Sequence, residues 1–270
     1  MTAYERVMAA RDSKKLTAVD YISHMFGDSF FELHGDRRYE DDKAIVAGLA
    51  MLYDTPITVI GIEKGRNIKE RVERNFGQAH PEGYRKALRL MKQAEKFRRP
   101  VLCLVDTSGA FCGIGAEERG QGQAIAENLM EMMTLKTPVL TILIGEGGSG
   151  GALALAVADE VWMLENSVYS VISPEGCASI LWKDSSKAPE AAEALKMTAQ
   201  DLFGLGVIER IIRQPKADDK AMFESLKLLV SRTFEKNLAM TNEELLEHRY
   251  GRFRKIGANQ NNTLSDKETT

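Results

Sequence analysis

The spacing of apolar positions along this chain switches repeatedly between the period of a strand and that of a helix. Short runs rich in β-branched residues predict buried strands. Between them, apolar residues spaced three or four apart predict amphipathic helices. The expected strands are Ala44–Leu52, Ile57–Ile62, Val101–Val105, Val139–Ile144, Val161–Leu164, Tyr169–Ile172 and Val207–Ile212. Strands alternating with helices predict an α/β fold whose mainly parallel sheet is covered by helices.

Turn and capping residues set the expected boundaries. Tyr53–Pro56 predicts a hairpin between the first two strands, and Thr17 with Asp20 forms a capping box. The other expected helices are Pro81 to about Phe97, Glu117 to about Leu135, Gly151–Ala158, Pro189–Lys196 and Ala217–Leu238, with further starts at Ser173, Thr198 and Thr241.

The domain organisation follows from what interrupts this pattern. No linker divides residues 44–212, so we expect a single domain over residues 1–256 with helical N- and C-terminal extensions. Residues 257–270 contain Asn, Thr, Ser and charge with almost nothing apolar, which predicts a disordered tail.

Composition and charge exclude several classes of protein. Among 270 residues, 36 Lys and Arg nearly balance 39 Asp and Glu, which argues against wholesale binding to nucleic acid or anionic lipid. The longest apolar stretches, Val139–Ile144 and Ala152–Ala158, are too short to cross a bilayer. Three cysteines without a CxxC pair favour a reducing, cytoplasmic location. Four scattered histidines make a metal site in this chain improbable, so none is expected.

The segment of residues 145–152, GEGGSGGA, stands between a buried strand and an apolar helix. Its five glycines have no evident packing purpose. Glycine lets the backbone approach a ligand closely, and a helix start leaves N–H groups unpaired. Such a place favours a phosphate or a developing oxyanion. A tight turn with nothing bound is the plain alternative.

The segment satisfies two sequence motifs, and each of them implies a known kind of site. Gly145, Gly147 and Gly150 satisfy GxGxxG, and Glu165 stands where a ribose-binding acid would lie in a dinucleotide site. The segment also satisfies GxSxG, which would make Ser149 a nucleophile on a strained elbow.

A serine hydrolase would need a downstream histidine, and only His248 qualifies.

In a third interpretation, the backbone amides of Gly150, Gly151 and Ala152 form an oxyanion hole for a thioester or urea carbonyl. Periodicity alone does not choose among the three.

A basic segment offers a different candidate. Residues 64–99 hold twelve Lys and Arg against four Asp and Glu, a net charge of 12 − 4 = +8. Either this is a solvated helix face, or Lys64, Arg66 and Lys69 form an anion site for coenzyme A phosphates or a carboxylate. On the second interpretation the chain could also be a non-catalytic anion-binding or scaffold subunit.

Several long sequence segments help to decide among these interpretations of the glycine segment. Residues 106–120, DTSGAFCGIGAEERG, resemble the loop of the acetyl-coenzyme A carboxylase carboxyltransferase alpha-subunit family, although Ser108, Phe111 and Cys112 replace Pro, Tyr and Pro. The resemblance covers roughly Leu16–Arg254. It includes residues 32–37 (ELHGDR), 80–88 (HPEGYRKAL), 145–152, 169–178 (YSVISPEGCA) and 180–183 (ILWK).

This resemblance implies a fold, a reaction and partners. The fold is the crotonase (ClpP/crotonase-like) spiral of repeated ββα units. A beta subunit, which carries the zinc, would complete an α2β2 complex. Carboxybiotin on the biotin carboxyl carrier protein would supply a carboxyl group to acetyl-CoA, giving malonyl-CoA. ATP is consumed by a separate biotin carboxylase, so no cofactor is expected in this chain.

The resemblance also assigns residues. The alpha oxyanion hole maps to Gly150 and Gly151, with Ala152 adjacent, and stabilises charge on the ureido carbonyl of biotin. The residues expected to face biotin or coenzyme A are Lys64, Arg66, Gly109, Ala110, Phe111, Gly113, Gly147, Gly148, Ser149, Glu175 and Gly176.

Overall fold

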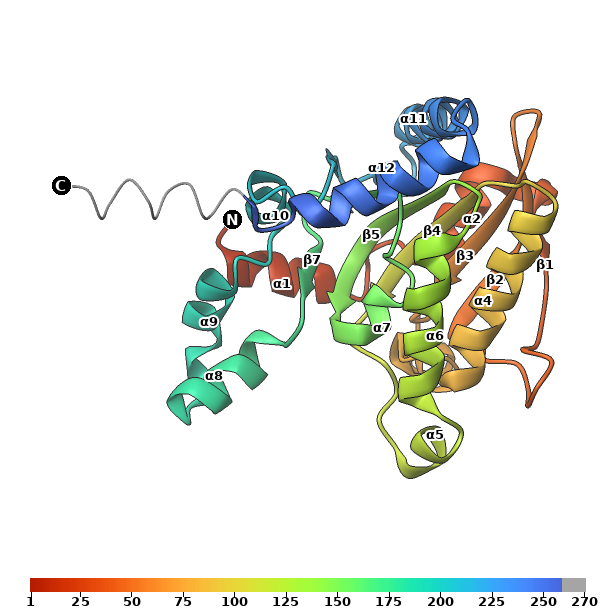
Figure 1. Ribbon diagram of the computed structural model, residues 1–270. Helices are drawn as coiled ribbons and strands as arrows, with labels where there is room; N and C mark the ends of the chain where they lie inside the picture. Colours follow the sequence, from red (N-terminus) through yellow and green to blue (C-terminus); the bar gives the residue numbers. More distant parts are fainter. Residues whose placement is uncertain (259–270) are drawn as a thin grey trace.

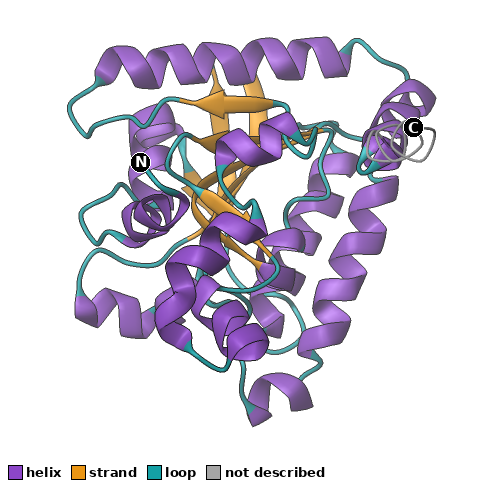
Figure 2. Ribbon diagram, turned by 90° about the vertical axis from the view of Figure 1, so that its left-hand side faces the viewer, coloured by secondary structure: helices purple, strands orange, loops and turns teal. Residues whose placement is uncertain are grey.

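A mixed eight-stranded sheet runs through the computed structural model, which describes residues 1–258 of the 270 (Figures 1 and 2). The strands are β1 (Phe31–Glu32), β2 (Ile45–Leu52), β3 (Thr55–Ile62), β4 (Val101–Thr107), β5 (Val139–Gly148), β6 (Glu160–Leu164), β7 (Val168–Ser170) and β8 (Arg210–Ile212). Their order is β1-β2-β3-β4-β5-β6-β8, and β7 pairs with the far end of β5. β1, β2 and β3 are antiparallel, whereas β3 to β8 pair in parallel.

Helices cover both faces of this sheet. They are α1 (Ala3–Arg11), α2 (Ala18–Phe26), α3 (Ile68–Glu73), α4 (Pro81–Lys96), α5 (Ile114–Glu118), α6 (Gln121–Thr134), α7 (Ser149–Leu153), α8 (Pro174–Trp182), α9 (Ala188–Leu195), α10 (Ala199–Gly204), α11 (Lys220–Leu238) and α12 (Asn242–Lys255). Three 3₁₀ turns are η1 (Gly27–Ser29), η2 (Asn75–Gly77) and η3 (Ser185–Lys187).

Two hydrophobic cores result, one on each face. α4 and α6 lie side by side on one face, where Leu90 and Met91 of α4 are fully buried (Figure 1). α2 and α11 cover the other face, with Tyr21 and Phe234 buried. The apolar stripes that predicted these helices are therefore the faces that the sheet buries, and the expected α/β architecture is confirmed.

Local signals placed several elements correctly. The hairpin of β2 and β3 is present, with register Leu52↔Thr55 at its turn. Pro81 occupies the first turn of α4, and Thr17 with Asp20 forms the capping box of α2. Each of these predictions rests on a local sequence preference, and the tertiary structure is compatible with that preference.

The expectation for the glycine segment was wrong in its secondary structure. β5 does not stop at Ile144 but continues to Gly148, because this end of the strand still pairs with β4 and β7. α7 is correspondingly short and ends at Leu153 instead of reaching Ala158.

Other boundaries also differ. The helix expected from Glu117 to Leu135 is two helices, α5 and α6, because Gly120 between them adopts a left-handed conformation with φ +81°. The strands expected to begin at Tyr169 and Val207 are shorter, as β7 ends at Ser170 and β8 begins at Arg210.

The two ends of the chain complete the description. α1 was not expected as an element of its own, and it packs against α9 and β5. The predicted tail, 257–270, lies outside the described residues except for its first two. The single domain over 1–256 stays a prediction. Among the described residues, no helix combines the length and hydropathy needed to cross a bilayer.

Candidate active site

The end of β5 and the start of α7 lie directly against the loop that follows β4. A Cβ on Gly148 would lie 2.2 Å from the Ser108 carbonyl oxygen, and one on Gly151 would lie 2.6 Å from the Ala110 amide nitrogen. The expectation that these glycines serve no packing purpose was therefore wrong, because backbone meets backbone here with no room for a side chain. Gly150 differs, since its Cβ would make an ordinary 3.6 Å contact with Ile125.

The amides assigned to the oxyanion hole differ in their exposure. The N–H groups of Gly150 and Gly151 belong to the first turn of α7, where a helix supplies no acceptor. Neither donates a hydrogen bond to another described element. Gly150 is half-buried and lines a cavity, whereas Gly151 and Ala152 are buried and line neither of the cavities beside it. Gly150 is thus the most exposed of the three residues, and it lies at a cavity wall.

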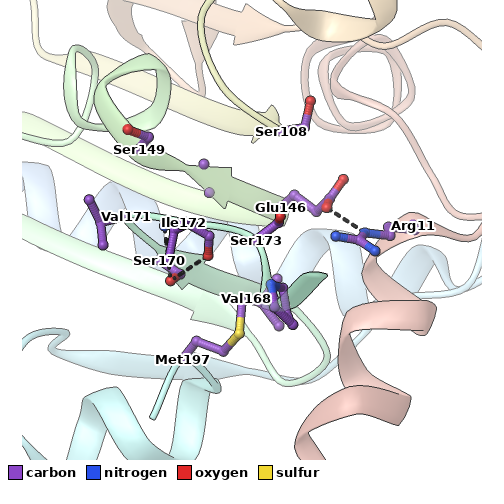
Figure 3. A pocket seen from close by; sticks show the side chains of 13 residues that line it. Arg11, Ser108, Glu146, Ser149, Val168, Ser170, Val171, Ile172, Ser173 and Met197 are labelled. Carbon is purple, nitrogen blue, oxygen red and sulfur yellow. Dashed lines mark hydrogen bonds and ion pairs between the residues drawn. The ribbon is translucent and has the colours of Figure 1, made fainter. Parts of the chain in front are cut away.

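Two cavities meet at the glycine turn. The smaller, of about 60 Å³, lies between β5, β7 and the start of α8 and includes Gly147, Gly148 and Ser149 (Figure 3). The larger, of about 310 Å³, is mostly apolar. Ser149, Ser170 and Val171 line both. The larger one is completed by Gly150, Leu153, Tyr169, Leu202 and Val207.

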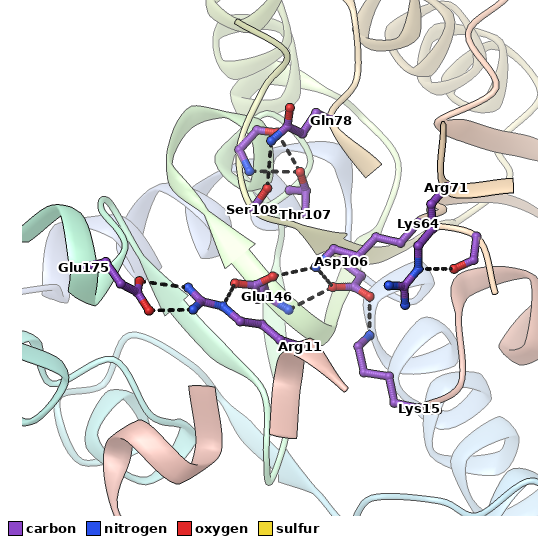
Figure 4. Close-up of polar contacts among 12 residues, drawn as sticks. Arg11, Lys15, Lys64, Arg71, Gln78, Asp106, Thr107, Ser108, Glu146 and Glu175 are labelled. Carbon is purple, nitrogen blue, oxygen red and sulfur yellow. Dashed lines mark hydrogen bonds and ion pairs between the residues drawn. The ribbon is translucent and has the colours of Figure 1, made fainter. Parts of the chain in front are cut away.

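Six side chains of alternating charge form a chain of ion pairs at the C-terminal end of β5 (Figure 4). Arg11 bonds Glu175 at 2.8 Å and Glu146 at 2.7 Å. Lys64 then joins Glu146 at 2.6 Å to Asp106 at 3.0 Å, and Lys15 also pairs with Asp106. The Asp106 carboxylate accepts the Glu146 backbone N–H as well. Three cations and three carboxylates therefore tie α1, β4, β5 and α8 together.

Burial makes this network sensitive to the loss of a partner. The Asp106 side chain is 1% exposed. Burial alone would raise its pKa, but the charges and hydrogen bonds of Lys15 and Lys64 hold the pKa of Asp106 at about 2. Burial would likewise lower the pKa of Lys64, and the two carboxylates raise it instead. Both groups are charged at neutral pH.

The predicted loop residues stand beside the glycine turn without lining either cavity. Thr107 Oγ1 accepts the Gly109 N–H and donates to the Gly109 carbonyl. The Phe111 ring stacks on His80 with centroids 4.1 Å apart, and its carbonyl accepts from Gln121. Hydrogen bonds and stacking thus hold the segment of Gly109, Ala110, Phe111 and Gly113 in place.

The predicted charged residues are largely engaged by the protein itself. Lys64 lies in the ion network, and the exposed Arg66 pairs with Asp20. The Glu175 carboxylate is held by Arg11. Gly176 is next in the chain, and its N–H donates to the capping Ser173 hydroxyl.

The solvated helix face considered above accounts for only part of the basic segment, because Lys96 is exposed but Lys86 is not. Lys86 is fully buried, and its Nζ lies 2.7 Å from both Asp41 and the Ile45 carbonyl oxygen. Arg85 pairs with the buried Asp36 at 2.7 Å. Carboxylates from outside the segment, with buried Glu82 inside it, neutralise much of its charge.

Ser149 resembles an elbow nucleophile in its backbone but lacks a base. It is exposed and has a left-handed φ of +48°, a strained value for serine. No histidine of the described residues hydrogen-bonds its side chain. His248 belongs to α12 and lines a different cavity together with Lys236 and Glu247.

Sequence reasoning missed the residues that hold the site together. Arg11 and Lys15 belong to no motif, and Asp106 and Glu146 lie within residues 106–120 and 145–152, where the motifs gave these two carboxylates no role. The only available signal was a carboxylate inside or just after an otherwise apolar strand, at Asp106 and Glu146. Such a residue has to find a cation once the strand is buried.

Solved structures define the class of this fold. One chain of a Pseudomonas malonate decarboxylase hetero-tetramer superposes with a TM-score of 0.72 at 15% identity, over 94% of this chain and 100% of that one. A transcarboxylase 12S structure gives a TM-score of 0.65 at 18% identity, over 82% of this chain and 43% of that one. The fold is thus that of the crotonase-like carboxyltransferases and their relatives.

Sequence comparisons identify the family. The family model described as acetyl co-enzyme A carboxylase carboxyltransferase-like matches residues 1–257, and the chain belongs to this family. The alpha subunit of Ruminiclostridium cellulolyticum acetyl-coenzyme A carboxylase carboxyl transferase is 59% identical over 257 residues, 95% of this chain and 98% of that protein. A Natranaerobius thermophilus protein named as subunits beta/alpha is 56% identical over 261 residues, 95% of this chain and 43% of its own length.

Proposed function

We propose that this chain is the alpha half of a carboxyltransferase that moves a carboxyl group from carboxybiotin to acetyl-CoA, yielding malonyl-CoA for fatty acid synthesis. The family match over residues 1–257 carries the proposal. Gly150 supports it as well, because its N–H belongs to the first turn of α7, the residue lines the larger cavity, and this reaction needs a donor for developing negative charge and no protein nucleophile.

In the proposed reaction the first turn of α7 binds the ureido carbonyl of biotin. The Gly150 N–H donates to the carbonyl oxygen as the N–C bond to the carboxyl group breaks and charge develops there; Gly151 and Ala152 add the dipole of the turn. The carboxyl group leaves as CO2, the freed ureido nitrogen takes a proton from the acetyl methyl group, and the methyl carbon forms the new C–C bond to that CO2. Loss of one such donor typically raises the barrier by about 3 kcal/mol.

The partners follow from the same assignment. A zinc-bearing beta subunit in an α2β2 complex would hold acetyl-CoA, while the biotin carboxyl carrier protein, charged by an ATP-dependent biotin carboxylase, delivers carboxybiotin. Exposed apolar side chains support a protein partner: Val171, which lines both cavities, and Ile180, Leu181 and Trp182 at the C-terminal end of α8. A relative with beta and alpha names in one chain is consistent with such a pair.

The test is reconstitution with the beta subunit, followed as biocytin-dependent decarboxylation of malonyl-CoA. We expect activity in the mixture only, and we expect Ser149→Ala to keep it within about tenfold, because removing a hydroxyl leaves every amide donor in place.

Two outcomes would favour the alternatives. A folded but inactive Ser149→Ala variant, with Ser149 labelled by a fluorophosphonate in the wild type, would indicate a serine hydrolase. A stable complex that never turns over would indicate a non-catalytic scaffold or anion-binding subunit.

A further inference from the structure

A third cavity, of about 190 Å³, lies against the ion network, with Arg11, Lys64 and Glu146 in its lining. It shares Arg11, Ser108 and Glu146 with the small cavity at the glycine turn, so the two adjoin. Its remaining lining residues are Lys64, Arg71 and Phe76. The cavity therefore carries three cations against one lining carboxylate.

Only one of these cations has its charge unmatched. Arg11 and Lys64 both bond Glu146. Arg71 has no carboxylate partner within residues 1–258, and its one hydrogen bond runs from Nε to the Gly65 carbonyl oxygen at 3.3 Å (Figure 4). Its two terminal NH₂ groups remain available as the flat fork that suits a carboxylate or phosphate.

The neighbouring turn holds an aromatic side chain at this cavity by an unusual backbone. Asn75, Phe76 and Gly77 all have positive φ, at +49°, +55° and +76°. Such values are costly for an aromatic residue and persist only where the surroundings enforce them. Gly77 is pressed against Lys64 and the Asp106 carbonyl, and Phe76 is half exposed. The turn thus places Phe76 in the wall of the cavity that Arg71 also lines.

We propose that Arg71, with Phe76 and the Ser108 hydroxyl, forms a subsite for an anionic group of the substrate next to the reacting centre. This inference rests on the proposed function. Its ligand is a carboxylate or phosphate oxygen pair, supplied either by the carboxyl group in transfer or by coenzyme A phosphates. The subsite is not built on Lys64 and Arg66, because carboxylates of the protein already engage both.

The experiment compares two thioesters that differ only in the transferable carboxylate. Dissociation constants for malonyl-CoA and acetyl-CoA are measured by equilibrium dialysis on the complete complex, with wild type and Arg71→Gln. Arg74→Gln is the matched control, since Arg74 bears the same charge three residues on, bonds the Lys43 carbonyl and does not line the cavity.

We expect Arg71→Gln to weaken malonyl-CoA binding about 10- to 100-fold, the size of one lost charge-assisted pair, and Arg74→Gln to leave it unchanged. Loss for malonyl-CoA alone assigns the carboxylate, and equal loss for both thioesters assigns a phosphate. If Arg71→Gln binds both with wild-type affinity in a complex that still turns over, the subsite is refuted while the proposed function stands. A wild-type complex with no biocytin-dependent turnover would refute both.

Discussion

Gly150 and Gly151 are neighbours in the first turn of α7, but they face different surroundings. A methyl group on Gly151 would meet the Gly109–Ala110 backbone at 2.6–2.7 Å, whereas one on Gly150 meets only the flexible Ile125 side chain at 3.6 Å. We expect Gly151→Ala to lower the free energy of unfolding by about 1–3 kcal/mol, and Gly150→Ala to change it by less than about 1 kcal/mol. Urea unfolding of both variants measures the difference.

The Gly150→Ala and Gly151→Ala variants also distinguish an effect on stability from an effect on catalysis. Because Gly150→Ala should fold normally, its activity reports how closely substrate approaches this amide. We expect a loss of roughly 100-fold, comparable to the loss of an oxyanion donor. Gly122→Ala is the control, since a methyl group there meets nothing within 4 Å. Equal instability of the two α7 variants would contradict the packing argument, and full activity in Gly150→Ala would contradict close approach.

At this scale the sequence located the glycine turn but not the reason for each glycine. Residue types and spacing indicate where a backbone is left bare. They do not show that Gly148 and Gly151 must accommodate Ser108 and Ala110, because that contact depends on how β4 and β5 lie in the sheet. The free charge of Arg71 was hidden for the same reason: twelve cations of one segment look alike until their partners are placed.

Among the elements, α1 connects β5 to α8 through ion pairs, and the sequence pattern did not reveal this role. Its last residue, Arg11, bonds both Glu146 on β5 and Glu175 on α8. We expect Arg11→Met to lower the free energy of unfolding by about 1–3 kcal/mol, because it leaves the mostly buried Glu146 with Lys64 as its only cation. Urea unfolding and faster amide exchange at the end of β5 would both report the loss.

Lys14→Met is the control for this prediction. Lys14 is exposed, close in sequence and of the same charge, so its removal should cost no more than about 0.5 kcal/mol. Equal effects of the two substitutions would mean that α1 is held by its apolar contacts alone.

Helices and strands that are determined by their own sequence were predictable. Those that depend on pairing with other parts of the fold were not. α4 shows its N-terminal proline and apolar stripe in the sequence. By contrast, Gly145–Gly148 is a strand only because β4 and β7 pair with it, and glycine has little strand preference of its own. α5 and α6 were merged because a left-handed Gly120 is not distinguishable from a helical glycine by type.

Across the whole molecule, the ion network links the N-terminal segment to the central sheet and makes stability depend on pH. The folded-state pKa of Asp106, about 2, lies below the roughly 3.9 of an unfolded aspartate. Its contribution, roughly 2 kcal/mol, is therefore fully present above about pH 5 and is lost as pH falls through 4 toward 2. Substituting Asp106 removes the group that titrates, whereas substituting Lys15 removes one of the two cations that lower the pKa of Asp106.

We therefore expect Asp106→Asn to be less stable than wild type at pH 7, where Lys15 and Lys64 would lose their shared anion, yet to have a shallower fall in stability between pH 4 and 2. Lys15→Met should make the fall smaller and end it at a higher pH, because one of the two cations that lower the folded-state pKa of Asp106 is gone while the unfolded-state pKa is unchanged. Urea unfolding at half-unit pH steps, with Lys14→Met as the charge-matched surface control, measures both effects. Parallel curves for wild type and Asp106→Asn below pH 4 would show that this carboxylate does not couple the sheet to the N-terminal segment.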